Sequence, residues 1–327
     1  MRKKTNMFHS FKSAVVLLCL AVPMLASAQT WPTQPIKIIV PFTPGTGMDT
    51  IARAVSPKLG ERLGQPVIVQ NMAGASGNIG ADAVAKSNAD GYTVLMGANT
   101  MLMASQLYKN APFNPVKDFS SVSMAAWGTL MLVANPKTGI KTLPELLANA
   151  RAKPGAINYG SPGVGTPHHM AMELFKSKTG LFMLHVPYRG TAGYTQDLLS
   201  GELMVGFLPV HIAQGFVNAG KLIALAVGSP KRHPVAPTVA AFDELGVKGV
   251  DVDLWYAFFL PAKTPSAVVS RLNTEIAAIL KLPEVRDLLG RAGMDAATSS
   301  PEELTTLVNK DYPRWGEVIK RNAITAE

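Results

Sequence analysis

Apolar and polar positions along the chain follow two alternating patterns. Short apolar runs, often β-branched, are each followed by a segment in which apolar residues recur every three or four positions, the spacing of one helix face. The first such pair is the run 36–40 and the segment 48–59, and further apolar runs lie at 66–70, 92–97, 130–135 and 157–161. This alternation predicts an α/β fold with parallel-rich sheets covered by helices on both faces. Pro57 removes a backbone hydrogen bond in the first helical segment, so we expect it to kink or shorten that helix.

The C-terminal part of the chain has a different pattern. After the apolar run 253–262, three helical segments begin near residues 264, 283 and 300, and no further strand is predicted. We expect these C-terminal helices to cross back to the first half of the chain. Because no low-complexity linker interrupts the sequence, we place the domain boundaries in crossing strands near 128–132 and 250–256. Residues 29–130 plus 253–327 then form domain 1, and residues 131–252 form domain 2.

The first 28 residues have the pattern of a secretory signal peptide. A basic start is followed by an apolar core at 14–25 and by Ala26-Ser27-Ala28, in the order of a cleavable leader. The core is too short to span a bilayer, so we predict cleavage after Ala28 and export to a bacterial periplasm. Cys19 is the only cysteine and follows Leu18, whereas lipid anchoring would need a small residue there. The exported chain would therefore be soluble and free of disulfides and thiolate chemistry.

The amino-acid composition and the distribution of charge limit the kind of molecule that the chain can bind. Hydrophobic residues make up 47% of the chain, and the formal net charge is +9. Four of the basic residues lie in the predicted leader, and the others are scattered rather than gathered in a stripe with aromatic residues. This distribution argues against nucleic-acid binding.

Two glycine-rich loops, 43–49 and 160–168, each follow a predicted strand and open a predicted helix. Such a helix start presents free backbone N–H groups and favours an anion, although glycine there can also serve a tight turn alone. Neither loop contains Lys or Arg or matches a nucleotide-binding fingerprint. An anion would be held by amides and by the hydroxyls of Thr46, Ser161 and Thr166, which suits a carboxylate that must be released. If the loops belong to different domains, they face each other across a cleft.

Longer segments of the sequence, taken together, resemble a known protein family more specifically than either glycine-rich loop does alone. They begin with WPTQPIKIIVPFTPGTGMDTIARAVSPKLGERLGQPVIVQN and continue with GASGNIGADAVAKSNADGYTVLMG, PVKDFSSVS, INYGSPGVGTPHHMAMELF, HVPYRG and GKLIALAV. Together they resemble the Bug family, the periplasmic solute-binding proteins of tripartite tricarboxylate transporters, over essentially the whole exported chain. The resemblance implies two α/β domains of the type II periplasmic binding protein kind, a hinge of crossing strands, and a small carboxylate in the cleft. We expect a monomer without cofactor or metal, whose partners are the membrane permease subunits of such a transporter.

The resemblance places the ligand against both glycine-rich loops. The candidate ligand-binding residues are Phe42, Thr43, Pro44, Gly45, Thr46, Gly47, Asp49, Asn99, Ser161, Gly163, Gly165, Thr166, His168 and Leu208. Leu208 stands in GFLPV where the family commonly has an Asp that would suit a ligand ammonium group. The substitution argues against an amino-acid ligand and favours a more apolar ligand body.

Several of these residues have simpler interpretations. His168 and His169 cannot chelate one ion, because adjacent helix residues point about 100° apart, so we expect His168 in a polar cleft wall and His169 in a packing or surface role. Asp49 is expected to complement the positive end of the first helix, with ligand contact as the alternative. Trp255 and Tyr256 are expected in hinge or core packing, with lining of a pocket as the alternative.

Three functions are compatible with these patterns. The first is a non-catalytic periplasmic protein that closes two domains around a di- or tricarboxylate or an aromatic acid and delivers it to a tripartite permease. The second is a sensory module that presents the same liganded form to a membrane histidine kinase. The third is a secreted hydrolase, for which Ser161 and His168 would form a dyad, but the chain lacks a G-x-S-x-G elbow.

Overall fold

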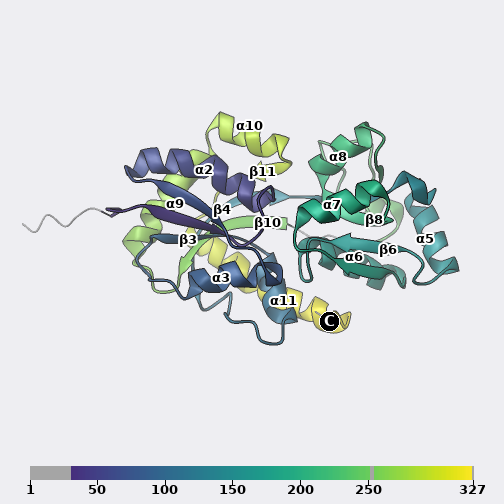
Figure 1. Ribbon diagram of the computed structural model, residues 1–327, viewed down its shortest axis with the longest axis horizontal. Helices are drawn as coiled ribbons and strands as arrows, with labels where there is room; N and C mark the ends of the chain where they lie inside the picture. The colour runs from purple at the N-terminus through teal and green to yellow at the C-terminus, as the bar shows by residue number, and fades with distance from the viewer. Residues whose placement is uncertain (1–30, 251–253, 326–327) are drawn as a thin grey trace, which may run out of the picture. The chain divides into compact units, whose positions relative to one another are not determined.

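Two β-sheets, each flanked by helices, carry the part of the chain that the structure describes (Figure 1). The structure is a computed structural model that describes residues 31–250 and 254–325. The predicted leader, its cleavage point and Cys19 lie outside these residues. The mixed α/β architecture with two sheets and C-terminal helices agrees with the fold class expected from the sequence.

The first sheet has the strand order β11-β4-β10-β3-β1-β2. Its strands are β1 (Ile36–Val40), β2 (Val67–Asn71), β3 (Thr93–Ala98), β4 (Phe119–Gly128), β10 (Leu254–Pro261) and β11 (Met294–Ala296). β1 runs parallel to β2 and β3, whereas β10 runs antiparallel to both β3 and β4. The expectation of parallel-rich sheets is therefore wrong in this detail, because the returning strand β10 inserts antiparallel into the sheet.

The strand β11 corrects the expectation that no strand follows residue 262. It has three residues and pairs antiparallel with the end of β4. A strand this short has no readable periodicity, since two alternating positions do not distinguish a strand from a loop. It forms because β4 offers it an unpaired edge.

The second sheet has the order β7-β6-β8-β5-β9. Its strands are β5 (Leu130–Ala134), β6 (Asn158–Ser161), β7 (Leu184–Pro187), β8 (Val205–Pro209) and β9 (Ile223–Val227). β6 runs parallel to β7 and β8, and β5 lies antiparallel between β8 and β9. This sheet is thus also mixed.

Helices cover both sheets. They are α2 (Gly47–Leu63), α3 (Asn78–Ala85), α4 (Thr100–Leu107), α5 (Leu143–Ala152), α6 (Pro167–Thr179), α7 (Thr191–Ser200), α8 (Val210–Asn218), α9 (Ser266–Leu280), α10 (Pro283–Arg291) and α11 (Pro301–Arg321). Short 3₁₀ turns lie at Ala75–Gly77, Pro136–Thr138 and Asp243–Leu245. Figure 1 shows α2, α9 and α10 on one side of the first sheet and α3 and α11 on the other.

The helix starts follow local sequence signals. Thr46, Thr142, Thr166 and Ser300 each accept a hydrogen bond from a backbone N–H in the first turn of the helix that follows, which satisfies one donor that the helix leaves free. Pro57, in contrast, does not shorten α2, which continues to Leu63. Arg53 and Pro57 both lie on the exposed face of α2, so the carbonyl that loses its partner is available to water.

The chain passes between the sheets at two places. β4 ends at Gly128 and β5 begins at Leu130, and the return precedes β10, which begins at Leu254. The sequence analysis places its domain boundaries near these positions, and the division into two domains stays a prediction. Trp255 is fully buried in the core of the first sheet and donates from Nε1 to Asp311 of α11 at 2.9 Å, as expected for core packing.

Candidate functional site

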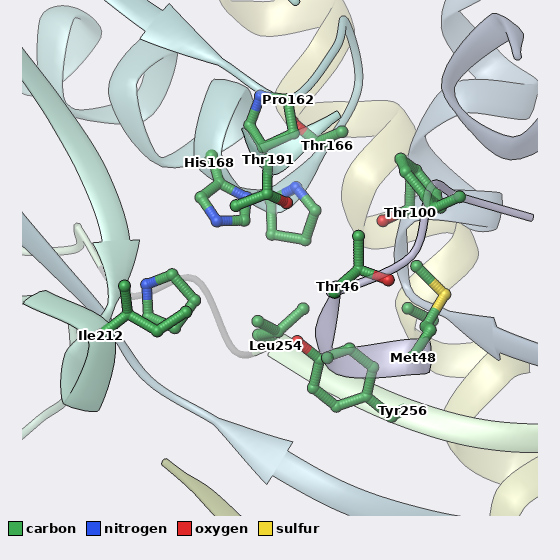
Figure 2. Close-up of a pocket in the computed structure, with 16 residues that line it drawn as sticks. Thr46, Met48, Thr100, Pro162, Thr166, His168, Thr191, Ile212, Leu254 and Tyr256 are labelled. Atoms are coloured by element: carbon green, nitrogen blue, oxygen red, sulfur yellow. The ribbon is translucent and has the colours of Figure 1, made fainter. Parts of the chain in front are cut away.

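The starts of α2 and α6 meet β10 at a small cavity of about 50 Å³, partly open to solvent. Thr46, Thr166 and His168 line this space, and Figure 2 shows Leu254 and Tyr256 of β10 along one side of it. None of the described residues that line it is Lys, Arg, Asp or Glu. Its polar groups are the hydroxyls of four threonines and a tyrosine and one imidazole, and the remaining walls are mostly apolar.

The first wall is the turn from β1 to α2. Thr46 Oγ1 accepts a hydrogen bond from the N–H of Asp49 at 3.3 Å and so caps α2. Gly47 is the first residue of the helix, and its Cα lies directly against the side chain of Tyr256. A Cβ at this position would stand 2.5 Å from Tyr256 Oη and 2.8 Å from Cζ, which is far inside van der Waals contact. Glycine is therefore required here by the approach of β10 to the helix start.

Asp49 stabilises this turn from behind the cavity. Its buried carboxylate accepts hydrogen bonds from Gly45 N at 3.0 Å, Asn71 Nδ2 at 2.9 Å and Arg53 Nε at 3.0 Å. Burial alone would raise the pKa of the Asp49 carboxyl, but the hydrogen bonds from Arg53, Gly45 and Asn71, together with the positive charge of Arg53, lower it. The carboxylate is thus ionised and already bound by three protein groups. It does not line the cavity.

We expect Asp49→Asn to destabilise the β1–α2 turn. The amide would replace one acceptor oxygen with a donor that faces Gly45 N–H or Arg53, so at least one buried hydrogen bond is lost, at about 1–3 kcal/mol. Urea unfolding monitored by circular dichroism should show this loss in the free energy of unfolding. Arg53→Gln is the matched control with a smaller effect, because Arg53 is half exposed. Unchanged stability of Asp49→Asn would contradict the role assigned to this carboxylate.

The second wall is the turn from β6 to α6. Thr166 caps α6 by accepting from His169 N, and its hydroxyl donates to Gly163 O at 2.7 Å. A Cβ at Gly165 would lie 3.0 Å from Leu107 Cδ1 and 3.1 Å from Ala104 Cα, both on α4, and Gly165 also has a φ of +77°. The turn therefore packs closely on a helix of the first sheet. This contact brings the two glycine-rich loops into one site.

His168 and His169 have different environments, as expected for adjacent helix residues. His169 Nδ1 accepts from Gly165 N at 3.2 Å, and its ring stacks on His185 at 4.2 Å between centroids. His168 faces the cavity, is 9% exposed, and neither of its ring nitrogens has a hydrogen-bond partner among the described residues. Burial lowers the pKa of His168 to about 4, so the imidazole is neutral at pH 7.

The predicted site residues divide into three groups by location. The cavity is lined by Phe42, Gly45, Thr46, Gly47, Thr166 and His168. An adjoining space of about 690 Å³, which shares Phe42 with the cavity, is lined by Thr43 and Gly163. Neither space is lined by Pro44, Asp49, Asn99, Ser161, Gly165 or Leu208. For all three groups, contact with a ligand stays a prediction.

Two members of the last group are engaged elsewhere in the protein. Ser161 Oγ lies 2.7 Å from His185 Nε2 and 3.0 Å from Gly163 O, and Ser161 is fully buried. Leu208 is also fully buried, in the hydrophobic cluster of the second sheet with Met131 and Tyr194. The proposed Ser161–His168 dyad is not formed, since the histidine on Ser161 is His185 and the nitrogens of His168 have no partner among the described residues.

Other cavity-lining residues were missed by the sequence analysis or kept only as an alternative. Thr100 and Thr191 begin α4 and α7 and line the cavity, so they repeat the strand–turn–helix signal of the two glycine-rich loops. Leu254 and Ile212 contribute apolar surface to the cavity. Neither lies in a glycine-rich loop at a helix start. Tyr256 lines the cavity, which is the alternative that the sequence analysis left open for this residue.

Within residues 31–250 and 254–325 no group of three or more His, Cys, Asp or Glu side chains is arranged to hold a metal ion. Across the same residues no helix combines the length and apolar character needed to cross a membrane.

Comparison with known sequences shows what the chain is similar to. A protein-family profile described as "Tripartite tricarboxylate transporter family receptor" matches residues 51–324. Protein BugT of Bordetella pertussis is 34% identical over 296 residues, which covers 90% of this chain and 91% of that protein.

Solved structures show the same similarity. A structure of an R. palustris protein with adipate has a TM-score of 0.85 and 32% identity, over 90% of this chain and 99% of that one. The protein MatC from Rhodopseudomonas palustris with bound malate has a TM-score of 0.83 and 28% identity, over 88% of this chain and all of that one.

Proposed function

We propose that this chain, which belongs to the tripartite tricarboxylate transporter receptor family, captures a small carboxylate with an apolar body in the cavity between α2 and α6. As a member of that family it is a periplasmic solute-binding protein. The observation that carries the proposal is that two helix N-termini meet at one cavity whose described lining contains no charged side chain.

This arrangement suits an anion that must be released. A helix N-terminus carries partial positive charge and free N–H donors, and here the hydroxyl of Thr46 lies beside them. The Thr166 hydroxyl also lines the cavity, but its hydrogen is donated to Gly163 O. A salt bridge with a buried guanidinium would hold a carboxylate more firmly than these partial charges do. The similar proteins with adipate and with malate support a carboxylate ligand for this chain.

The lining residues of the cavity also indicate that the ligand has no essential ammonium group. An amino-acid ligand would bring an ammonium group, and no Asp or Glu is found among the described lining residues to pair with it. Phe42, Met48 and Leu254 offer an apolar surface instead. We therefore infer an aliphatic or aromatic acid without an essential ammonium group.

A thermal-shift screen followed by calorimetry tests this proposal. The panel contains adipate, succinate, malate, benzoate, 4-hydroxybenzoate, aspartate and a neutral sugar. We expect at least one acid to stabilise the chain by about 2.7 kcal/mol at a hundredfold excess over its Kd, with aspartate much weaker. Recovery of the acid unchanged after incubation distinguishes binding from hydrolysis. Tight binding of the sugar or of aspartate, with no effect of the other acids, would contradict the proposal.

Delivery to a membrane permease is the second part of the proposal. The chain, acting as a monomer, would present its liganded form to the membrane subunits of a tripartite tricarboxylate transporter. Co-purification of the chain with permease subunits, stronger with the acid than without it, is the expected result. Ligand-dependent retention by a histidine kinase ectodomain and none by the permease would assign the sensory role instead.

A further inference from the structure

One feature of the cavity is not explained by carboxylate binding alone. It is the imidazole of His168, which has no hydrogen-bond partner among the described residues. The side chain is 9% exposed, and neither Nδ1 nor Nε2 has a hydrogen-bond partner among the described residues. Buried polar groups in folded proteins are nearly always hydrogen-bonded, and an unsatisfied one is costly. Because no described residue supplies a partner for either nitrogen, a group that enters the cavity is the candidate partner.

The protein groups around the ring are poorly placed to satisfy it. Tyr194 meets the ring edge-on at 6.2 Å between centroids, but its hydroxyl donates to Phe207 O. Figure 2 shows the ring facing the cavity near Thr191 and Ile212. Proline side chains at 162, 167 and 209 complete the wall. A bound water needs two to four polar partners, and this mostly apolar surface offers few.

The hydrogen-bonding capacity of the ring limits the ligand. With its pKa lowered to about 4, the imidazole is neutral at pH 7, so one nitrogen carries a hydrogen and donates while the other accepts. An ionised carboxylate has acceptors only. It satisfies the donor nitrogen, but the acceptor nitrogen needs an O–H or N–H group of the ligand. No described Asp or Glu lines the cavity, so an O–H group fits better than a charged ammonium.

We propose that His168 is a specificity-determining residue which recognises a hydroxyl group on the ligand, so that the preferred solute is a hydroxylated carboxylate with an apolar body. The hydroxyl donates to the acceptor nitrogen of His168, and a ligand oxygen accepts from the other nitrogen. The ligand carboxylate lies toward the amides at the start of α2. This assignment rests on the proposed function, because it concerns the same cavity and the same class of solute.

Matched pairs of acids test the assignment. Calorimetry would compare benzoate with 4-hydroxybenzoate and with 3-hydroxybenzoate, and succinate with malate, on the full exported chain. We expect the hydroxylated member of at least one pair to bind tenfold or more tightly. In His168→Phe, which keeps a planar ring without nitrogens, this preference should fall to less than twofold, and the affinity for the parent acid should fall as well because the donor nitrogen is lost.

A second variant of His168 and a control at another histidine distinguish a loss of ligand recognition from a loss of folding. His168→Gln keeps one donor and one acceptor, so it should retain part of the preference for the hydroxylated acid. His233→Phe replaces a histidine that does not line the cavity and should leave the preference unchanged. Circular dichroism confirms folding for each variant.

The outcomes distinguish carboxylate capture by the chain from hydroxyl recognition by His168. Equal binding of both members of every pair by the parent chain would overturn the role of His168 while leaving carboxylate capture intact. A preference for hydroxylated acids that persists in both His168 variants would also overturn the role of His168 and leave carboxylate capture intact. If no acid binds the parent chain, the proposed function and this inference fail together. Loss of preference in His168→Phe with partial retention in His168→Gln supports the assignment.

Discussion

Gly47→Val is expected to weaken binding of the best acid of the panel by at least a hundredfold, or about 2.7 kcal/mol. The new Cβ would stand 2.5 Å from Tyr256 Oη and 3.2 Å from Met294 Sδ. Tyr256 cannot move away easily, because its strand β10 is paired on both sides with β3 and β4. The valine methyl groups must then occupy the cavity or displace the start of α2. Calorimetry with that acid measures the effect.

The same substitution elsewhere provides the control. Gly290 lies in α10, where a Cβ has no atom within 4 Å, so Gly290→Val should leave affinity unchanged. Overpacking at Gly47 costs about 1–3 kcal/mol of stability, and the milder variant Gly47→Ala covers the case in which the valine variant does not fold. Affinity of Gly47→Val within threefold of the parent would show that the ligand does not use this helix start.

Acid is expected to remove several kcal/mol from the free energy of unfolding between pH 6.5 and pH 4. Burial lowers the pKa of His168 and of His169 to about 4 and that of His185 to about 3, and the positive charge of Lys176 contributes for the last two. An unfolded histidine titrates near 6.5. Across this range the unfolded chain binds protons that the folded chain excludes, so stability is full above pH 6.5 and falls as the pH decreases.

Urea unfolding at pH 7.5, 6 and 5 measures this dependence. Each histidine contributes up to about 1.4 kcal/mol per pH unit within the range. His168→Phe should remove about one histidine's share of the slope, because phenylalanine does not titrate. Asp49, whose pKa is lowered, contributes stability that is lost only at lower pH, near the ordinary range of a carboxyl. A free energy of unfolding that is equal at pH 7.5 and pH 5 would contradict the prediction.

The local features of this protein can be predicted from its amino-acid sequence. The strand runs and the placement of both glycine-rich loops at helix starts appear in the structure. These features depend on residues within a few positions of one another, such as a threonine side chain and the N–H three residues later. The family resemblance, which uses the whole chain, predicted the α/β architecture in addition.

Contacts between segments distant in sequence determine which of those residues face the cavity. Ser161 lies in a predicted ligand loop but meets His185 from the neighbouring strand, and Asp49 meets Asn71 at the end of β2. Tyr256, far along the chain from both loops, forms a wall instead. The antiparallel insertion of β10 and the strand β11 were decided in the same way. Each depends on a partner distant in sequence, and local spacing contains no information about which distant segment will pack against it.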